Sequence, residues 1–223
     1  MLFTKHLKQK RSGENMKAFV FTGGNIRVEN ITEKPDAEDI IIAADSGYNN
    51  AKAMEITPHL LVGDFDSLGK KNIPSGIKTV ELPEEKDVTD TQVAVDAAIE
   101  NGASQIVIIG GLDGRLDHTL SNLALLRFLF EKNIYAVITD GVNRVRYIKS
   151  TSTLLARSRF KYFSVIADDE KVKGVDIEGG KYPLKNGTVF RNHQYAVSNE
   201  ITGNCALISV KKGGVFIVES DPQ

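Results

Sequence analysis

Short, unbroken runs of apolar residues separated by helix-like stretches fill the first part of this chain. A strand with one solvent-exposed face alternates apolar and polar residues, whereas strands of a parallel sheet are buried on both faces and read as continuous apolar runs. The expected strands are 18–21, 40–44, 60–62, 79–82, 106–109 and 135–138. Strands alternating with helices in this way predict an open, mainly parallel α/β sheet.

Helical patterns lie between these strands. An apolar stripe with spacings i, i+3, i+4, i+7 and i+8 runs from Thr91 to Ile99, and Gly102 beyond it suits a helix C-terminus. Asp87 or Thr89 is expected to cap the start of this helix. The stretch 118–132 is apolar on nearly all sides, which predicts a well-buried helix.

After about Val145 the pattern changes to short β-like pieces separated by Gly-rich or polar turns, without a useful helical period. The expected strands are 163–166, 172–175, 188–190, 205–210 and 215–218. This arrangement predicts a C-terminal all-β sandwich. We therefore expect an α/β domain at 16–145 and a β-sandwich domain at 146–223. Residues 1–15 lack the apolar core of a signal peptide and are expected to be a disordered extension or an upstream start before a native Met16.

Composition narrows the class of protein. A net charge of -1 gives no basic footprint for nucleic acid, and the longest apolar runs are too short to span a bilayer. Cys205 is the single cysteine, which excludes an internal disulfide and fits a reducing, cytoplasmic compartment. Because an apolar run follows it, Cys205 is expected to be a small core residue.

Carboxylates and glycines follow the expected strands. Ligands of open α/β sheets bind beyond the carboxyl ends of the strands, so these residues are the candidates for a site. Asp45 follows the second strand, and Asp64 and Asp66 follow the third. Two carboxylates at i and i+2 can face one cation, and all-oxygen ligands favour Mg²⁺ over Zn²⁺. Taken by itself, the pair is explained equally well by an Asp-rich turn in which Asp66 or Ser67 caps a helix. Asp45 at the end of a neighbouring strand favours the metal site.

Asp90 enters the first turn of the 91–99 helix on the side of the same sheet edge. A helix N-terminus favours anions, so a carboxylate there together with a phosphate implies a bridging cation. Lys86 is a candidate phosphate contact or simply a solvated charge.

The segment 110–118, Gly-Gly-Leu-Asp-Gly-Arg-Leu-Asp-His, is the most specific motif. Gly110, Gly111 and Gly114 lie between a buried strand and a helix, which suits a loop that brings backbone N–H groups onto phosphates. Arg115 adds a forked cation, and Asp117 can fix Arg115 or bind a metal. A helix cap explains Asp117 as well, and a buried, hydrogen-bonded histidine explains His118. The segment matches neither the Walker nor the dinucleotide-binding pattern.

Together these motifs resemble the thiamine pyrophosphokinase family. The matching segments are 44–47, 63–67, 86–90, 110–118 and, more weakly, 198–200. The resemblance implies an α/β catalytic domain, a β-sandwich domain and a homodimer with active sites between subunits. It also implies a Mg²⁺-dependent transfer of pyrophosphate from ATP to thiamine, which gives thiamine diphosphate and AMP.

Carried onto this chain, the resemblance assigns roles residue by residue. Asp45, Asp64, Asp66 and Asp90 hold magnesium and the triphosphate, and Asp90 also orients the thiamine hydroxyl. ATP contacts come from Thr89, Arg115 and Asp117, with the glycines Gly111 and Gly114 and the neighbouring His118. Ser198 and Asn199 of the partner chain bind the thiamine ring. Some relatives stack a tryptophan on the pyrimidine, but this chain has no Trp, so another residue must take that place.

Other functions fit parts of the pattern. A pyrophosphokinase acting on a hydroxymethyl pterin differs only in the β-domain and its Ser-Asn segment. A non-catalytic ATP sensor does not need so many carboxylates at a phosphate site. A metal-dependent phosphohydrolase releases phosphate without an acceptor.

Overall fold

The computed structural model describes residues 16–66, 75–83 and 87–222. The chain divides into two compact units, the first ending at Gly141 and the second beginning at Val142. The extension at 1–15, Ser67 and Lys86, all named from the sequence, lie outside the described residues.

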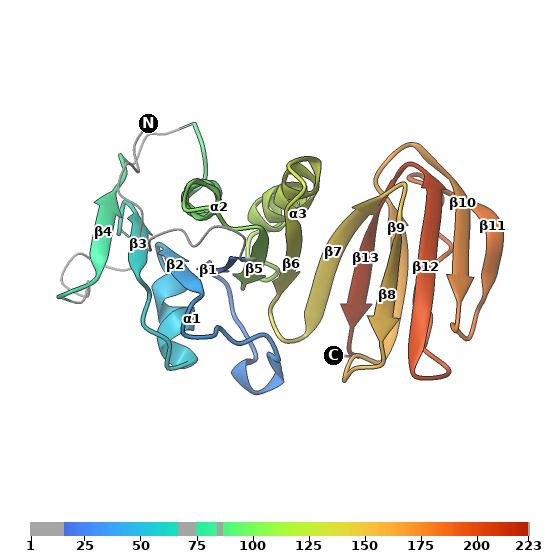
Figure 1. Cartoon of the computed structure of the whole chain (residues 1–223), viewed down its shortest axis with the longest axis horizontal. Coiled ribbons are helices and arrows are strands. Elements are labelled where there is room, and N and C mark those ends of the chain that lie inside the picture. The colour runs from blue at the N-terminus through green and yellow to red at the C-terminus, as the bar shows by residue number, and fades with distance from the viewer. Residues whose placement is uncertain (1–15, 67–74, 84–86, 223) are drawn as a thin grey trace. The chain divides into compact units, whose positions relative to one another are not determined.

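The first unit is built on a sheet with the strand order β4-β3-β2-β1-β5-β6 (Figure 1). Every neighbouring pair in this order is parallel. The bounds are β1 Lys17–Phe21, β2 Ile40–Ala44, β3 Leu60–Gly63, β4 Lys78–Glu81, β5 Gln105–Ile109 and β6 Tyr135–Thr139. The strands expected from the apolar runs are therefore confirmed, with bounds that differ by a residue or so.

Helices cover both faces of this sheet. The bounds are α1 Gly47–Ala53, α2 Asp90–Glu100 and α3 Leu116–Glu131, with a short 3-10 turn, η1, at Val28–Asn30. Figure 1 shows α1 on one face and α2 and α3 on the other. The connections explain this, because β2–α1–β3 leads away from β1 in one direction and β5–α3–β6 leads away in the other. Right-handed crossovers in opposite directions place their helices on opposite faces.

Alternate residues of the strands fill two apolar layers. Phe19, Phe21, Ile41 and Leu61 form one cluster with Ala51 of α1. Their strand neighbours, Ala18, Val20, Ile40, Ile42 and Leu60, are also buried and point to the opposite face. Burying one such large side chain contributes about 1.5–3 kcal/mol, so both layers stabilise the sheet. Burial on both faces is the reason for the unbroken apolar runs.

The two longer helices differ in how well the sequence describes them. Helix α2 has Thr89 as its N-cap, with the Thr89 hydroxyl accepting a hydrogen bond from the Gln92 N–H (3.2 Å), and Gly102 follows its end at φ +89°. Both features confirm the prediction. The prediction that the second helix is well buried is wrong for its first turns, because Leu116 is 69% and Leu120 59% exposed. An apolar helix buries only the side that packs on the sheet, and here that side includes Leu125, Leu126 and Leu129.

The second unit is antiparallel. One sheet has the order β7-β13-β9, and another has the order β11-β10-β12-β8. The bounds are β7 Asn143–Lys149, β8 Ser152–Ala156, β9 Tyr162–Ala167, β10 Lys171–Glu178, β11 Leu184–Phe190, β12 Cys205–Lys212 and β13 Gly214–Ser220. Buried residues of both sheets form a shared apolar core that includes Phe163, Val165, Val175, Ile208 and Ile217. The expected sandwich is confirmed, whereas β7 and β8 were not expected.

Cys205 is exposed, so its prediction as a core residue is wrong. Strand alternation explains the difference. Ala206, Ile208 and Val210 of β12 point into the core, which leaves Cys205, at odd spacing from them, on the outer face.

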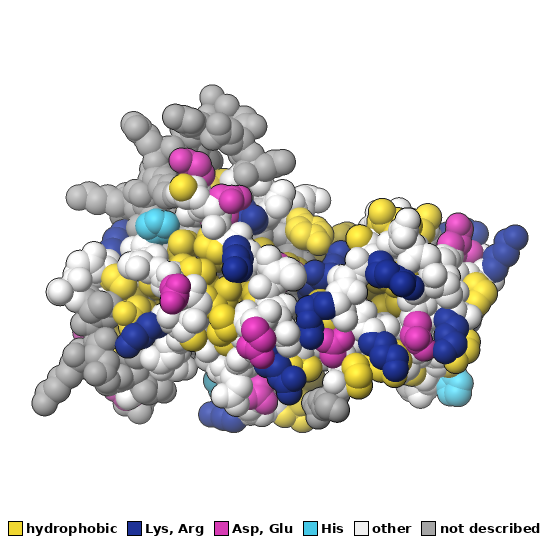
Figure 2. Space-filling model, turned by 90° about the horizontal axis from the view of Figure 1, so that it is seen from below, with side chains coloured by type: hydrophobic (Ala, Val, Ile, Leu, Met, Phe, Trp, Pro, Cys, Tyr) yellow, Lys and Arg dark blue, Asp and Glu magenta, His cyan; other side chains and the backbone are white. Residues whose placement is uncertain are grey.

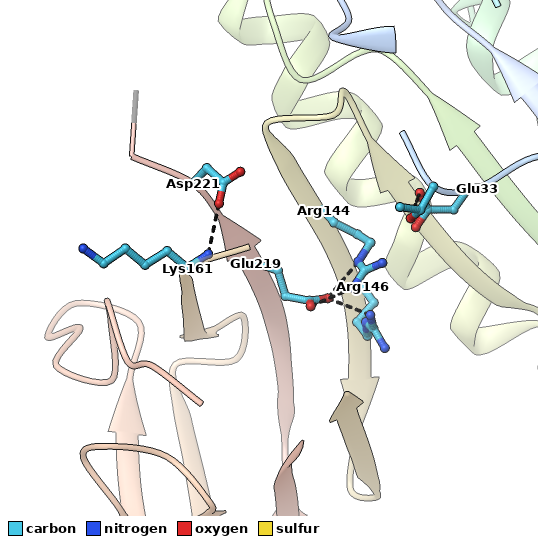
Figure 3. Close-up of polar contacts among 7 residues, drawn as sticks. Glu33, Arg144, Arg146, Lys161, Glu219 and Asp221 are labelled. Atoms are coloured by element: carbon cyan, nitrogen blue, oxygen red, sulfur yellow. Dashed lines mark hydrogen bonds and ion pairs between the residues drawn. The ribbon is translucent and has the colours of Figure 1, made fainter. Parts of the chain in front are cut away.

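A charged cluster lies at the β7–β13 pairing (Figure 3). Glu219 accepts two hydrogen bonds from Arg144, at 2.9 and 2.7 Å, and one of 2.7 Å from Arg146. The Glu219 side chain is only 3% exposed, and the arginine side chains are 14% and 12% exposed. These charges therefore interact in a poorly solvated environment.

In the part of the chain that the structure describes, no helix is long and apolar enough to cross a membrane. On the face shown in Figure 2, acidic side chains lie among the Lys and Arg side chains, so positive charge there does not form one continuous surface.

Candidate active site

The strand order places a topological switch point between β1 and β5. From β1 the chain proceeds outwards through β2, β3 and β4, and it then returns to β5 and proceeds to β6 on the other side. The loops that follow β1 and β5 diverge at this point, and ligands of open α/β sheets bind in the resulting crevice. The carboxyl ends of β1 and β5 are therefore the centre of the candidate site.

Backbone hydrogen bonds hold these loops together. The Thr22 N–H donates to the Ile109 carbonyl (2.9 Å), and the Gly111 N–H donates to the Gly23 carbonyl (2.8 Å). Gly110 and Gly111 have φ values of +95° and +75°. A Cβ at Gly110 would lie 2.5 Å from the Thr22 carbonyl oxygen, so only glycine allows this approach.

Buried or half-buried amides fix the same loops from the helices. Asn50 of α1 donates through Nδ2 to the carbonyls of Thr22 (2.7 Å) and Gly24 (2.9 Å). Asn122 of α3 donates to the Gly111 carbonyl (3.0 Å). Neither amide was expected from the sequence to act at the site. A polar residue such as Asn122 inside an otherwise apolar helix was the available signal, because buried polar groups need partners.

Asp45 lies directly beyond β2 in a left-handed conformation, with φ +45°. Its N–H donates to the Val62 carbonyl (2.7 Å), and a Cβ at Gly63 would lie 3.1 Å from the Asp45 Cβ. The Asp45 Oδ1 atom is buried and has no hydrogen-bond partner among the described residues. An orphaned buried carboxylate oxygen is costly unless a ligand or cation pairs with it, so Asp45 fits a cation site.

Asp64 and Asp66 flank a buried phenylalanine beyond β3. Phe65 is 1% exposed and has φ +64°, so its side chain anchors the turn in the core. Asp64 Oδ1 accepts a hydrogen bond from the Asp66 N–H (3.1 Å). The Asp-rich turn considered from the sequence is therefore present, and binding of a metal by its two carboxylates stays a prediction.

Helix α2 brings Asp90 to the same edge. Asp90 is the first residue of α2, directly after its cap, Thr89. The neighbouring Thr91 forms a hydrogen bond of 2.8 Å with Thr22, which follows β1. The start of α2 therefore lies beside the switch point.

Arg115, directly before α3, and Asp117, in the first turn of α3, form an exposed ion pair joined by two hydrogen bonds. Arg115 Nε and Nη2 donate to Asp117 at 3.1 and 2.6 Å, and the His118 N–H also donates to Asp117 (2.9 Å). The Arg115 hydrogen bond is the main cause that lowers the pKa of Asp117, and Asp117 in turn raises the pKa of Arg115. His118 is exposed, which excludes the buried histidine considered from the sequence.

Within the described ranges, no three His, Cys, Asp or Glu side chains gather closely enough to form a metal site. Mg²⁺ commonly takes only one or two protein carboxylates and completes its shell with substrate phosphates and water. The oxygen-only donor set and the orphaned Asp45 oxygen fit a cation that binds together with a phosphate ligand.

Ser198 and Asn199 lie in the second unit and differ in exposure. Ser198 is exposed, with φ +55°. Asn199 is buried, and its amide pairs with both backbone groups of Tyr182, donating to the carbonyl (2.7 Å) and accepting from the N–H (2.9 Å). Tyr182 itself is 61% exposed. The structure thus links an exposed aromatic ring, missed in the sequence analysis, to the Ser-Asn segment.

Comparisons with known proteins match both units. The family model described as "Thiamin pyrophosphokinase, catalytic domain" matches residues 32–138, and "Thiamin pyrophosphokinase, vitamin B1 binding domain" matches residues 151–215. Thiamin pyrophosphokinase 1 of Caenorhabditis elegans is 27% identical over 205 residues, which are 86% of this chain and 83% of that protein. Thiamine pyrophosphokinase of Bacillus subtilis is 28% identical over 198 residues, covering 86% and 92%.

Solved structures of the same family also have a similar fold. The crystal structure of thiamine pyrophosphokinase from Bacillus subtilis has a TM-score of 0.84 and 26% identity, and the match covers 93% of this chain and all 100% of that one. The fold and the matched domains define a kinase with a catalytic domain followed by a vitamin-binding domain. The chain belongs to the thiamin pyrophosphokinase family. These matches do not favour the pterin pyrophosphokinase, the ATP sensor or the phosphohydrolase.

Proposed function

We propose that this chain transfers the pyrophosphoryl group of ATP to the hydroxyl of thiamine, producing thiamine diphosphate and AMP. The observation that supports the proposal most directly is the joining of the Thr22–Gly23 loop, the Gly110–Gly111 loop and the start of α2 by hydrogen bonds at the switch point, one residue from Asp90. Family membership in both units supports ATP and thiamine as the substrates.

In the proposed reaction, the thiamine hydroxyl oxygen attacks the β-phosphorus of ATP. The bond between that phosphorus and the oxygen bridging to the α-phosphate breaks, and AMP leaves with this oxygen. Asp90 orients the hydroxyl and accepts its proton. Positioning and stabilisation of developing charge account for most of the catalysis in phosphoryl transfer, so the chain mainly has to hold the reactants in line.

The phosphate groups need donors and cations. We assign Gly111, Gly114, Thr89 and Arg115 to ATP, with Asp117 holding the Arg115 fork in place and His118 beside it. Asp45, Asp64, Asp66 and Asp90 are the residues that would hold Mg²⁺, which neutralises phosphate charge when bound.

Thiamine is assigned to the second unit. We assign Ser198 and Asn199 to the thiamine ring, and Asn199 also holds the backbone of Tyr182 through two hydrogen bonds. The exposed Tyr182 ring offers an aromatic face in a chain without tryptophan. We further propose a cytoplasmic homodimer in which the active sites lie between subunits.

The test is AMP formation from ATP and Mg²⁺, with and without thiamine. AMP that appears only with thiamine, alongside thiamine diphosphate, supports the proposal. AMP formed only with a hydroxymethyl pterin, or phosphate released without any acceptor, contradicts it.

Asp64→Asn is the sharpest variant for the metal assignment. It keeps the hydrogen-bond acceptor for the Asp66 N–H but loses the charge, so we expect a normal fold and a loss of turnover on the order of 10²–10³-fold, as for removal of one charge-stabilising group. Asp176→Asn is the matched control, since Asp176 likewise accepts from a backbone N–H, that of Asn186, but lies in the second unit. Unchanged turnover in Asp64→Asn contradicts the assignment.

A further inference from the structure

A buried pair of threonine hydroxyls links β1 to α2. The Oγ1 atoms of Thr22 and Thr91 are 2.8 Å apart, and the two residues are 6% and 7% exposed. Thr22 follows β1 at the switch point, and Thr91 follows Asp90 in the first turn of α2. The contact is therefore made one residue from the carboxylate that the proposed function assigns to the thiamine hydroxyl.

Thr22 is fixed by neighbours from several elements. Its N–H donates to Ile109 at the end of β5 (2.9 Å), and its carbonyl accepts from Asn50 of α1 (2.7 Å). Its methyl group packs close to Gly111, where an added Cβ would lie 2.8 Å from Thr22 Cγ2. A residue that forms a hydrogen bond with the Thr22 hydroxyl is therefore held at a fixed position relative to the Gly110–Gly111 loop.

The rest of the buried side of α2 is apolar. Apart from Thr91, its buried residues are Ala94, Val95, Ala97 and Ala98. Apolar contacts are non-directional, whereas a hydrogen bond between two buried hydroxyls is directional. A misplacement of about 1 Å at a reacting group can reduce the rate by about 10²-fold, so even a small shift of α2 matters.

We propose that Thr22 and Thr91 are positioning residues that set Asp90 relative to the Gly110–Gly111 loop. Neither hydroxyl touches the reactants, and the pair acts through the orientation of the first turn of α2. The inference rests on the proposed role of Asp90.

Variants that keep the shape and remove the hydroxyl test this role. We expect Thr22→Val and Thr91→Val to lower kcat by about 10- to 100-fold with little change in KM for ATP, because binding groups stay and only alignment is lost. Thr22→Ser and Thr91→Ser keep the hydroxyl and recover most of the rate. The double Val variant is no worse than either single variant, because the same contact is lost.

Asn101→Ala is the matched control. The Asn101 side chain makes a buried hydrogen bond of 2.8 Å to the Ala97 carbonyl at the opposite end of α2, so its loss lowers the midpoint of thermal unfolding and leaves kcat unchanged. Full kcat in the Val variants, or equal losses in the Val and Ser variants, overturns the proposal.

A readout without turnover separates this inference from the proposed function. The carboxyl and amide NMR resonances of Asp90 are expected to shift in both Val variants and to return in the Ser variants. Unmoved Asp90 resonances overturn the inference even if the wild-type chain makes thiamine diphosphate. A wild-type chain without thiamine-dependent turnover removes the proposed function, and shifted Asp90 resonances still support the positioning of Asp90.

Discussion

Asn25 and Asp113 join the loops that follow β1 and β5 across the switch point. Asn25 Nδ2 donates to Asp113 Oδ2 at 2.6 Å, and the Asn25 N–H donates to the same oxygen at 3.3 Å. Gly24, directly before Asn25, is so close to the second loop that a Cβ there would lie 2.9 Å from the Asp113 carbonyl oxygen. These contacts therefore hold the two loops together beside the candidate site.

We expect Asn25→Ala to weaken ATP binding by several-fold, since losing one hydrogen bond is worth about 0.5–1.5 kcal/mol and frees the loops to separate. Asp113→Asn keeps an acceptor and removes a negative charge, so ATP binding should stay near wild type or tighten. Calorimetric titration of each variant measures both. Equal weakening of ATP binding in the two variants contradicts this account, because the charge of Asp113 rather than its hydrogen bond with Asn25 would then decide the affinity.

Asp117 provides a prediction about pH. Its pKa is lowered, mainly by the Arg115 hydrogen bond, so its contribution to folding stability is present above the ordinary Asp pKa of about 3.9 and is lost as pH falls through the lower folded value. Arg115→Met should move the Asp117 pKa back up towards the ordinary value, as followed by carboxyl NMR. Arg127→Met, which removes the Arg127–Glu131 ion pair on the same helix, should leave it unchanged.

Gly110 and Gly76 form a matched pair for separating backbone strain from steric overlap. Their φ values are +95° and +98°, but a Cβ meets the Thr22 carbonyl oxygen at 2.5 Å in Gly110 and no atom within 4 Å in Gly76. Gly76→Ala should cost about 1–2 kcal/mol from the left-handed backbone alone. Gly110→Ala should cost at least 1–3 kcal/mol more, as overpacking does. Urea unfolding measures both, and equal losses rule out the close loop approach.

Glu219 should be among the most sensitive positions of the second unit. Glu219→Gln leaves Arg144 and Arg146 with reduced charge compensation in a buried cluster, for which we expect a loss of about 3–5 kcal/mol of unfolding free energy. Glu131→Gln is the control, because its pair with Arg127 is exposed and such pairs contribute about 0–1 kcal/mol. A small loss in Glu219→Gln means that the cluster is already well solvated.

The sequence described the parallel part of the fold well because burial on both faces leaves a plain signal. It missed β7, where Arg144, Arg146 and Lys149 break the apolar pattern, since nothing in the sequence shows that one glutamate on β13 neutralises two of these arginines. Cys205 was misplaced for a related reason, because strand phase depends on the register of neighbouring strands.

For the candidate site, the acidic residues and glycines could be proposed from the sequence because motif and strand end coincide. The sequence did not identify Thr22, Asn50, Asn122 or Tyr182, whose roles arise from contacts with residues far away in the chain. The hydrogen bond between Thr22 and Thr91, for example, joins residues 69 positions apart and is visible only in the structure.

The pairing of β1 with β5 also has a consequence for the newborn chain. Strand β1 leaves the ribosome well before β5, so Phe21 meets its partner Ile109 only after most of the first unit has been synthesised. Until then the glycine loop has no opposing strand end, and contacts so distant in sequence form slowly. The phosphate site proposed at this crevice can therefore form only after β5 has been synthesised, and ligand binding there would report that the first unit has completed its fold.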